Sequence, residues 1–244
     1  MRDYEPVLSF GKDVADLYDS DGLRGDETET VDYLVGLASH HNALELAIGT
    51  GRIGLRLAER GVPVTGIELS TAMAAKLAEK PGGDRIPLII GDFVDVEIDD
   101  TFQLIYVVFN TFFNVLTQDD QVRCFQNVAN HLTDTGVFVI ETFHPAFLYR
   151  LRDDQYVDAE RVEIDEVRLD VGRHDPVRQM LDESHVSLTP QGVRLYPVVC
   201  RYAWPSELDL MARIAGLRLH DRWGGWKGEA FTASSVRHIS VYGR

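Results

Sequence analysis

The stretch Leu44-Glu45-Leu46-Ala47-Ile48-Gly49-Thr50-Gly51-Arg52 decides the fold of this chain, together with Glu68 at the end of the next apolar segment. It begins as a short apolar strand and stops at two glycines, where a backbone without Cβ atoms can turn sharply and let a ligand lie against it. The next strand, predicted over residues 62–69, delivers the Glu68 carboxylate about twenty residues later, the spacing at which an acid reaches ribose hydroxyls. Together the two segments predict a site for a nucleoside cofactor.

Helices and strands alternate on both sides of this stretch. Apolar residues at helical spacing predict a helix over residues 28–38, and the chain after the glycines continues as a helix to Arg60. Ser70 and Thr117 are expected to cap two further helices. Strands are predicted over three more segments: residues 86–90, 104–109 and, after a turn at 134–136, 137–142.

Five strands alternating with helices predict a mostly parallel sheet that is covered on both faces. In such sheets, ligands bind at the carboxyl ends of the strands. The two glycines, Glu68, Asp92 and Asn110 all fall at predicted strand ends. We therefore expect them to line one site.

The pattern changes to a period of two between residues 155 and 204, which indicates antiparallel strands with a hairpin turn at 189–192. After it, Ser206 is expected to cap a helix that ends at Gly216, and strands follow at 217–223 and 238–242. We interpret the chain as one domain, 1–244. Its expected parts are an N-terminal helical lid (1–40), a cofactor-binding core (41–145), a β-rich insertion on the substrate side (150–204) and a C-terminal part that completes the sheet (205–244).

Composition excludes several classes of function. The 24 basic and 39 acidic residues give a formal net charge of −15, which repels phosphate backbones and anionic membrane surfaces. No apolar run approaches the roughly 20 residues of a membrane span, and no signal peptide is evident. Cys124 and Cys200 lie in apolar surroundings and are expected to be buried thiols. The sequence thus predicts a cytoplasmic protein that binds neither nucleic acid nor membrane.

The segment from Gly49 to Gly54 also satisfies the pattern GxGxxG, so an NAD(P)-dependent oxidoreductase has to be considered. Glu45 argues against it, because a dinucleotide fold normally keeps an apolar residue inside that strand. A buried carboxylate needs a partner. A cationic amine on the ligand or a network of backbone N–H groups would supply one.

At this point the residues resemble the class I S-adenosylmethionine-dependent methyltransferases, most closely the bacterial enzymes that methylate small molecules such as amino sugars. The family's motif, acid-x-Gly-x-Gly-x-Gly, stands here as Glu45 to Gly51, with Ala47 in place of the first glycine. Glu68 matches the acid that binds both ribose hydroxyls. Asp92-Phe93 matches the pair that holds the adenine amino group and packs its ring. The resemblance implies a Rossmann-like α/β fold with a mostly parallel seven-stranded sheet whose last strand is antiparallel.

The resemblance also implies the residues that hold S-adenosylmethionine. They lie in the N-terminal segment and at successive strand ends: Tyr18, Glu45, Ala47, Gly49, Gly51, Arg52, Glu68, Leu69, Met73, Gly91, Asp92, Phe93, Phe109 and Asn110.

Three residues are candidates for a catalytic role. Tyr18 lies in a segment similar to one whose tyrosine closes over the methionine end of the cofactor in the family; an ordinary packed aromatic is the alternative. His144, just past the fifth strand, is placed to act as a base for a hydroxyl acceptor, although a lone loop histidine is more often structural. Asn114 is a polar candidate for orienting the acceptor, as is Asn110.

Other features receive plainer interpretations. The loop 223–228 combines tryptophans with glycines and suits a lid, and a packed surface loop explains it nearly as well. The histidines show no metal-binding spacing, so no metal is implied. Asp119, Asp120 and the acidic segment 163–170 are interpreted as solvated faces. The sequence predicts a methyltransferase for an N or O atom of a small molecule, monomeric or homodimeric, with a cofactor-binding regulatory module as a further alternative.

Overall fold

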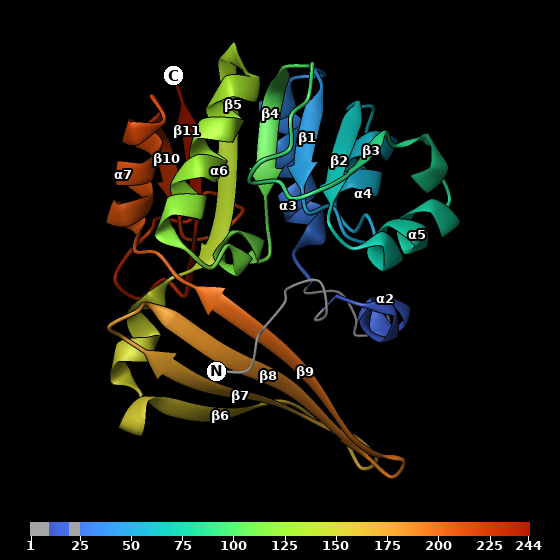
Figure 1. The fold of residues 1–244 in the computed structure, drawn as a ribbon, viewed down its shortest axis with the longest axis vertical. Coiled ribbons are helices and arrows are strands. Elements are labelled where there is room, and N and C mark those ends of the chain that lie inside the picture. The colour runs from blue at the N-terminus through green and yellow to red at the C-terminus, as the bar shows by residue number, and fades with distance from the viewer. Residues whose placement is uncertain (1–9, 20–24) are drawn as a thin grey trace.

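The computed structural model describes residues 10–19 and 25–244, and its main feature is a seven-stranded sheet with the order β10-β11-β5-β4-β1-β2-β3 (Figure 1). Strand β11 runs antiparallel to both of its neighbours, whereas the pairs formed by β1 to β5 are parallel. The predicted fold class, a mostly parallel seven-stranded sheet with one antiparallel strand, is confirmed. The lid prediction for 1–40 falls partly on residues 1–9 and 20–24, which lie outside the described residues.

The strands of this sheet follow the sequence pattern closely. Their bounds are β1 Ala43–Leu46, β2 Val64–Glu68, β3 Leu88–Ile90, β4 Phe102–Val107, β5 Leu132–Phe143, β10 Arg218–Trp223 and β11 Arg237–Gly243. The helices are α2 Lys12–Tyr18, α3 Glu27–Ala38, α4 Gly54–Glu59, α5 Thr71–Glu79, α6 Gln118–His131 and α7 Pro205–Ile214, with short 3₁₀ turns η1 Gly83–Arg85, η2 Thr111–Asn114, η3 Pro145–Arg150 and η4 Arg152–Asp154.

Two apolar cores lie on the two faces of this sheet. Successive strand residues point to opposite faces, so Leu44 and Leu46 join the core with α6 and α7, whereas Ala43 joins the core with α3 and α4. Phe125 of α6 anchors the first core through edge-to-face contacts with other rings, 5.4 Å from Phe138 and 5.6 Å from Tyr242. The sheet is therefore a buried platform, and its carboxyl edge is left for a ligand.

The predicted helix caps are confirmed at two positions and wrong at one. The hydroxyl of Ser70 accepts the N–H of Met73 at 3.2 Å, and that of Thr117 accepts the N–H of Asp120 at 3.1 Å. Ser206 does not cap α7, because Pro205 already occupies the first helical turn and Trp204 is the N-cap. Proline favours the first helical position, since its fixed φ suits a helix and it lacks the N–H that would go unpaired there.

The turn expected at 134–136 takes a different form. Strand β5 already begins at Leu132, and its register against β4 shifts so that Phe102 faces Leu132 while Leu104 faces Val137. Five steps along β5 are thus matched by two along β4. The exposed residues between Leu132 and Val137 form a bulge that leaves the ladder, instead of a turn that precedes the strand.

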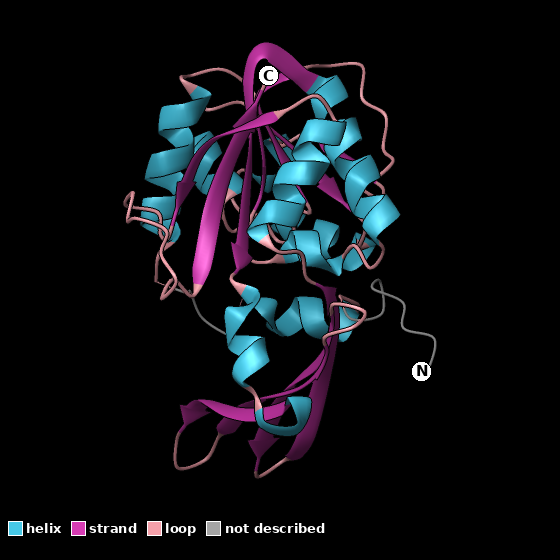
Figure 2. Ribbon diagram, turned by 90° about the vertical axis from the view of Figure 1, so that its left-hand side faces the viewer, coloured by secondary structure: helices cyan, strands magenta, loops and turns pink. Residues whose placement is uncertain are grey.

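A second, four-stranded antiparallel sheet hangs below the carboxyl edge of the first (Figures 1 and 2). Its strands are β6 Gln155–Val162, β7 Val167–Asp175, β8 Met180–Thr189 and β9 Gly192–Arg201. The predicted hairpin at 189–192 is confirmed by the pairing of Thr189 with Gly192. We call the face toward the seven-stranded sheet, which carries Tyr196 and Cys200, the inner face, and the opposite one the outer face.

Among the described residues, no helix combines the length and the apolar character that crossing a membrane requires.

Candidate active site

A cavity of about 280 Å³ opens at the carboxyl edge of the seven-stranded sheet. Its volume lies near the lower end of small-molecule pockets, which range from about 300 to 1,000 Å³. Five of the predicted cofactor residues line it, with two of their neighbours at the ends of β2 and β3, Phe10, and residues at and after η2 and in α6: Phe10, Ala47, Glu68, Leu69, Ser70, Asp92, Phe93, Val94, Thr111, Asn114, Val115, Leu116, Asp120 and Arg123. The structure thus brings Glu68 and Asp92 to one cavity, as the strand-end argument predicted.

Glu68 is fixed before any ligand arrives. One carboxylate oxygen accepts the backbone N–H of Gly49 at 2.8 Å, and the other accepts that of Ser70 at 2.7 Å. Burial raises the pKa of Glu68, and these backbone N–H groups oppose the shift by stabilising the carboxylate. A carboxylate has about four lone-pair positions, so two remain for hydroxyl donors in the cavity. The geometry suits an acid that accepts hydrogen bonds from a ribose.

Asp92 and Phe93 form the next part of the wall. The Oδ1 atom of Asp92 accepts the backbone N–H of Val94 at 2.9 Å, which holds its carboxylate in a fixed orientation beside the ring of Phe93. Gly91, just before them, donates its N–H to the carbonyl of Glu68 at 3.0 Å and so ties β3 to β2. A carboxylate next to an aromatic ring can accept an amino group and stack a flat heterocycle at once.

Several strand ends adopt a left-handed backbone that only glycine adopts readily. Ala47, at the first glycine position of the motif, has a φ of 56°, and Phe109 and Asn110 have φ values of 59° and 65°. Each such non-glycine residue costs on the order of 1 kcal/mol or more. Asn110 offsets part of that cost, because its Oδ1 accepts the N–H of Phe143 at 2.6 Å. Strain of this kind gathers at ligand sites.

Glu45 lies beneath the glycine loop and does not line the cavity. Its Oε2 atom accepts the hydroxyl of Tyr106 at 2.9 Å, and Gly54 supplies a backbone hydrogen bond. Burial raises the pKa of Glu45 to about 8. The partner that the sequence required is thus one tyrosine and one backbone N–H, and burial favours the protonated form of Glu45.

The glycines of the loop are needed for different physical reasons. A Cβ atom at Gly51, whose φ is 83°, would lie 2.4 Å from Cδ1 of the buried Leu77. At Gly54 it would lie 2.5 Å from Oε2 of Glu45, so this glycine lets the helix start approach β1 closely. At Gly49, with a φ of 59°, nothing of the protein lies within 4 Å. Met73, another predicted cofactor residue, is buried at the start of α5 and does not line the cavity.

The N-terminal helix α2 is held against this loop. Arg52 donates to the carbonyl of Tyr18 at 3.2 Å, and its guanidinium lies 4.8 Å from the centre of the Tyr18 ring and 5.6 Å from that of Phe109. Asp19 accepts the hydroxyl of Thr50 at 2.7 Å and pairs with Lys80 at 2.7 Å. We call these contacts of Tyr18, Asp19, Thr50, Arg52 and Lys80 the clamp over the loop. Neither the Tyr18 nor the Arg52 side chain lines the cavity.

Asn114 joins the two sheets. Its side-chain N–H donates to the carbonyl of Val199 at 3.3 Å, which fixes η2 against β9, and the residue also lines the cavity. Asp120 and Arg123 of α6 line the same cavity and pair at 2.7 Å. Asp120 was interpreted with Asp119 as part of a solvated face; its side chain is partly exposed, but it also lines the cavity. The only sequence signal that Asp120 would line a site was its position one turn after the Thr117 cap, because a helix cap places the first turn of the helix near a strand end.

His144 is half-buried and does not line the cavity. Its ring packs edge-on against Trp204, at 5.7 Å, and against Phe231, at 5.2 Å, and its Nδ1 atom contacts the carbonyl of Ser235 at 3.2 Å. The surroundings are those of a packed aromatic cluster. The loop 223–228 also packs away from the cavity, with Trp226 buried against Tyr33 of α3 at 5.7 Å, which fits the surface-loop alternative.

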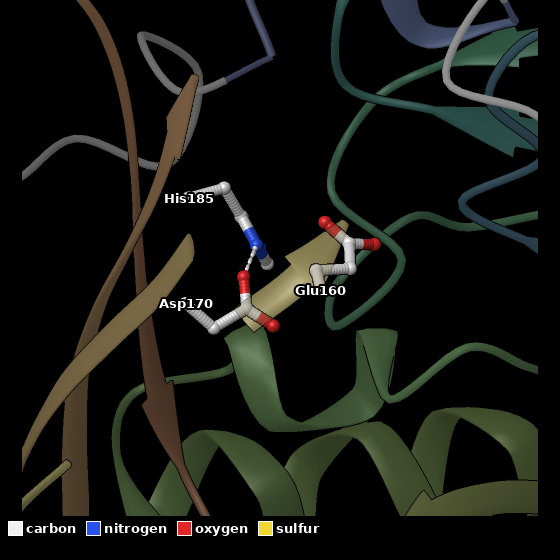
Figure 3. A group of neighbouring side chains, drawn as sticks. All are labelled: Glu160, Asp170 and His185. Atoms are coloured by element: carbon white, nitrogen blue, oxygen red, sulfur yellow. Dashed lines mark hydrogen bonds and ion pairs between the residues drawn. The ribbon is translucent and has the colours of Figure 1, made fainter. Parts of the chain in front are cut away.

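The inner face of β6–β9 brings together groups that are distant in sequence. Glu160, Asp170 and His185 lie side by side on β6, β7 and β8, and Figure 3 shows the His185 ring directed at the Asp170 carboxylate. The Nδ1 atom of His185 lies 2.5 Å from Oδ1 of Asp170, and this contact raises the pKa of His185. These residue types also bind divalent metals, but Nδ1 of His185 is already engaged by Asp170.

Aromatic rings connect this group to the cavity. His185 stacks on Tyr196 at 5.4 Å, and Tyr196 meets Phe10, a cavity residue, edge-on at 5.9 Å. Nearby on the same face, the hydroxyl of Tyr156 donates to the half-buried carboxylate of Glu183. The inner face therefore carries acidic and aromatic side chains beside Phe10 of the cavity, and Asp170, interpreted as part of a solvated face, is only partly exposed there.

Comparison with known proteins agrees with this geometry. A methyltransferase domain model matches residues 43–136. The CcbJ methyltransferase from Streptomyces caelestis is 35% identical, with a TM-score of 0.91 over 98% of this chain and 99% of that one. A cypemycin N-terminal methyltransferase from a Streptomyces species is 27% identical over 201 residues, 82% of each chain. A dTDP-4-amino-2,3,4,6-tetradeoxy-D-glucose N,N-dimethyltransferase from Saccharopolyspora spinosa is 33% identical over 139 residues, 54% of this chain and 55% of its own.

The chain belongs to the S-adenosylmethionine-dependent methyltransferases. The oxidoreductase alternative finds no support among these relatives. The donor set of this methyltransferase fits the cofactor: Glu68 offers a fixed carboxylate for the ribose, and Asp92 with Phe93 offers an acceptor and a ring for the adenine. The open space beside Gly49 leaves room for a ligand against the loop. This enzyme therefore uses S-adenosylmethionine, and its acceptor is a small molecule.

Proposed function

We propose that this methyltransferase transfers the methyl group to an amine nitrogen of a small natural-product molecule. The observation that carries the proposal is the acidic group on the inner face of β6–β9, where Glu160 and Asp170 lie beside His185, which connects through Tyr196 to the cavity residue Phe10. A wall of carboxylates attracts a cationic acceptor and raises its local concentration. An alcohol acceptor would gain nothing from that charge.

The residues of the chain divide the work between two ligands. Glu68 holds the ribose, Asp92 and Phe93 hold the adenine, and the loop from Ala47 to Gly51 holds the methionine end under the clamp. The cofactor supplies an electrophilic methyl group on a sulfonium sulfur. Since displacement there is in line, the protein's main task is to hold the acceptor nitrogen behind the methyl group. Asn114, at the joint between cavity and inner face, orients the acceptor.

An amine acceptor also explains why no base is required at His144. The amine binds as an ammonium ion, gives one proton to solvent water, and then presents its free lone pair to the methyl group. A hydroxyl needs a base to remove its proton during attack. The histidine predicted for that role packs instead between Trp204 and Phe231. Two relatives named for methylation of an amino terminus and an amino sugar support the same choice.

Matched acceptors test the proposal directly. The purified enzyme is incubated with S-adenosylmethionine and with pairs that differ only at the acceptor atom, such as a 4-amino sugar nucleotide and its 4-hydroxy analogue, or a peptide with a free or acetylated amino terminus. We expect the amine partner of at least one pair to gain a methyl group by mass spectrometry, with release of S-adenosylhomocysteine. Methylation of the alcohol in preference to the amine would overturn the proposal.

A further inference from the structure

A tyrosine and a glutamate meet across three strands on the inner face of the β6–β9 sheet. The register places Tyr156 of β6, Gly172 of β7 and Glu183 of β8 opposite one another in one row. A Cβ atom on Gly172 would lie 2.2 Å from Cε1 of Tyr156 and 2.8 Å from its hydroxyl oxygen. Because glycine has no Cβ atom, the Tyr156 ring can pass over β7 and donate its hydroxyl to Glu183.

This row lies next to the cofactor cavity. On β9 it ends between Tyr196 and Cys200, which share the inner face. Tyr196 meets the cavity residue Phe10 edge-on at 5.9 Å. The Sγ atom of Cys200 lies 3.8 Å from Nδ2 of the cavity residue Asn114. The row of Glu183 is thus flanked on both sides by rows that contact residues lining the cavity.

Glu183 keeps one carboxylate oxygen open. Its Oε1 atom accepts the hydroxyl of Tyr156, and within residues 10–19 and 25–244 its Oε2 atom has no hydrogen-bond or ion-pair partner. Burial raises the pKa of Glu183, because it penalises an anion, and the Tyr156 hydroxyl opposes that shift. Asp170, one row away, differs because its Oδ1 atom is engaged by His185. A cation at Oε2 would therefore stabilise the Glu183 carboxylate.

Aromatic rings continue from this pair toward the end of β5. The Tyr156 ring lies 6.4 Å from that of Phe147, which is 42% exposed, and Phe147 lies 5.8 Å from Phe143. Phe143 in turn donates its N–H to Asn110 at the end of β4. Aromatic faces attract organic cations, whereas a metal ion requires several oxygen ligands. One open carboxylate oxygen beside aromatic rings therefore suits an ammonium group.

We propose that Glu183, positioned by Tyr156, binds the nitrogen of the acceptor through its open oxygen and selects primary and secondary amines. The inference rests on the proposed function, since it assigns the group that holds the acceptor amine. After one proton has left to water, a primary or secondary amine still has an N–H for Oε2, and its lone pair is free for the methyl group. A tertiary amine has no N–H at that stage, so Glu183 cannot orient it.

Steady-state kinetics test the assignment with the amine that the wild type methylates, a 4-amino sugar nucleotide or a peptide with a free amino terminus. Glu183→Gln keeps the shape of the side chain and loses its charge. We expect the KM for the amine to rise about 10- to 100-fold, with unchanged affinity for S-adenosylmethionine. Glu163→Gln, in the exposed turn between β6 and β7, removes the same charge and should keep the wild-type KM. A rise in melting temperature with S-adenosylmethionine shows that each variant is folded.

Tyr156→Phe tests the positioning role of the tyrosine. The ring stays over Gly172 and only the hydroxyl is lost, so the KM for the amine should rise about 3- to 10-fold. In the Glu183→Gln background the same change should alter the KM by less than about 2-fold, because the charge that Tyr156 positions is already absent. An equal factor in both backgrounds would overturn the role of Tyr156. Should Glu183→Gln fail to fold, Tyr156→Phe decides alone, and an unchanged KM overturns the inference.

The products give a second readout. Mass spectrometry after long incubation should show a tertiary amine as the last product, and a quaternary product would overturn the selection. If the wild type methylates the amine but Glu183→Gln keeps the wild-type KM, or Glu163→Gln has the same effect, the inference fails and the proposed function stands. A wild type that methylates the alcohol in place of the amine overturns both.

Discussion

Carboxylates lie at the cavity and on the sheet beside it, in two regions that hold them in different ways. At the carboxyl edge of the seven-stranded sheet, Glu68 and Asp92 are fixed by backbone N–H groups one or two residues away or in the adjacent loop. On the inner face of β6–β9, Asp170 and Glu183 are held by side chains of other strands, His185 and Tyr156. Backbone donors cannot be exchanged by mutation, whereas side-chain donors can. We call the first region the cofactor half and, because the proposed acceptor would meet it, the second region the acceptor half.

The largest loss of cofactor binding is expected for Gly51→Val. The new Cβ would lie 2.4 Å from Leu77, and the φ of 83° is strained for valine, so we expect cofactor binding to fall below detection by calorimetry and the melting temperature to fall as well. Gly36→Val, in an open position of α3, is the matched control and should bind normally. Gly49→Ala separates the clash from the backbone strain, because its φ of 59° is also strained for alanine but its Cβ meets no protein atom and faces the ligand; retained affinity there would contradict the role of the loop.

A pH series tests the neutral carboxyl below the loop. The folded pKa of Glu45, about 8, lies above the value of 4.5 in the unfolded chain, so the native state binds the extra proton between these values. Stability therefore falls as the pH rises through that window, by an amount on the order of a few kcal/mol. Urea denaturation should show that the free energy of unfolding of Glu45→Gln rises relative to that of the wild type from pH 5 to 8. The exposed Glu79→Gln should keep the same pH dependence as the wild type. Parallel curves for all three would contradict the raised pKa.

Much of the cofactor half was predictable from the sequence because its signals are local. A glycine or an acid at the end of an apolar run identifies Gly49, Glu68 and Asp92 without knowledge of any distant contact. The Pro205 that starts α7 was an equally local signal, and it outweighed Ser206 as the determinant of that helix start.

The acceptor half could not be predicted in this way. Asp170 and His185 meet only because β7 and β8 pair in one register, and a shift by one residue would send the two side chains to opposite faces. The same pairing also aligns apolar side chains on the outer face, such as Leu169 with Val186. Residues that touch across strands leave no mark of their own in a linear pattern, so acidic positions in that segment resembled an ordinary solvated surface.

Glu68→Gln should separate the two halves by their kinetics. The amide has nearly the size of the carboxylate, but it has one acceptor oxygen fewer and no negative charge. These losses at the group that binds the ribose should weaken cofactor binding by about 1 to 3 kcal/mol. The KM for the acceptor should change little, because the inner face is untouched. Glu59→Gln, the same change at the exposed end of α4, serves as the control. Titration calorimetry that gives the wild-type affinity would remove Glu68 from the cofactor site.

The smallest effect is expected from Asp170→Asn, the converse of the previous change. The amide can still contact His185, but the wall loses one charge and the histidine loses the group that raises its pKa. A cationic acceptor should then bind less tightly, with a rise in its KM of about 3- to 10-fold and little change in cofactor affinity. Asp165→Asn removes the same charge from the exposed turn between β6 and β7 and should leave the KM unchanged. Because screening by salt weakens attraction between charges, the difference between these two variants should shrink as ionic strength rises. An equal effect of both variants would mean that the acceptor responds to the net charge of the sheet and is not held at Asp170.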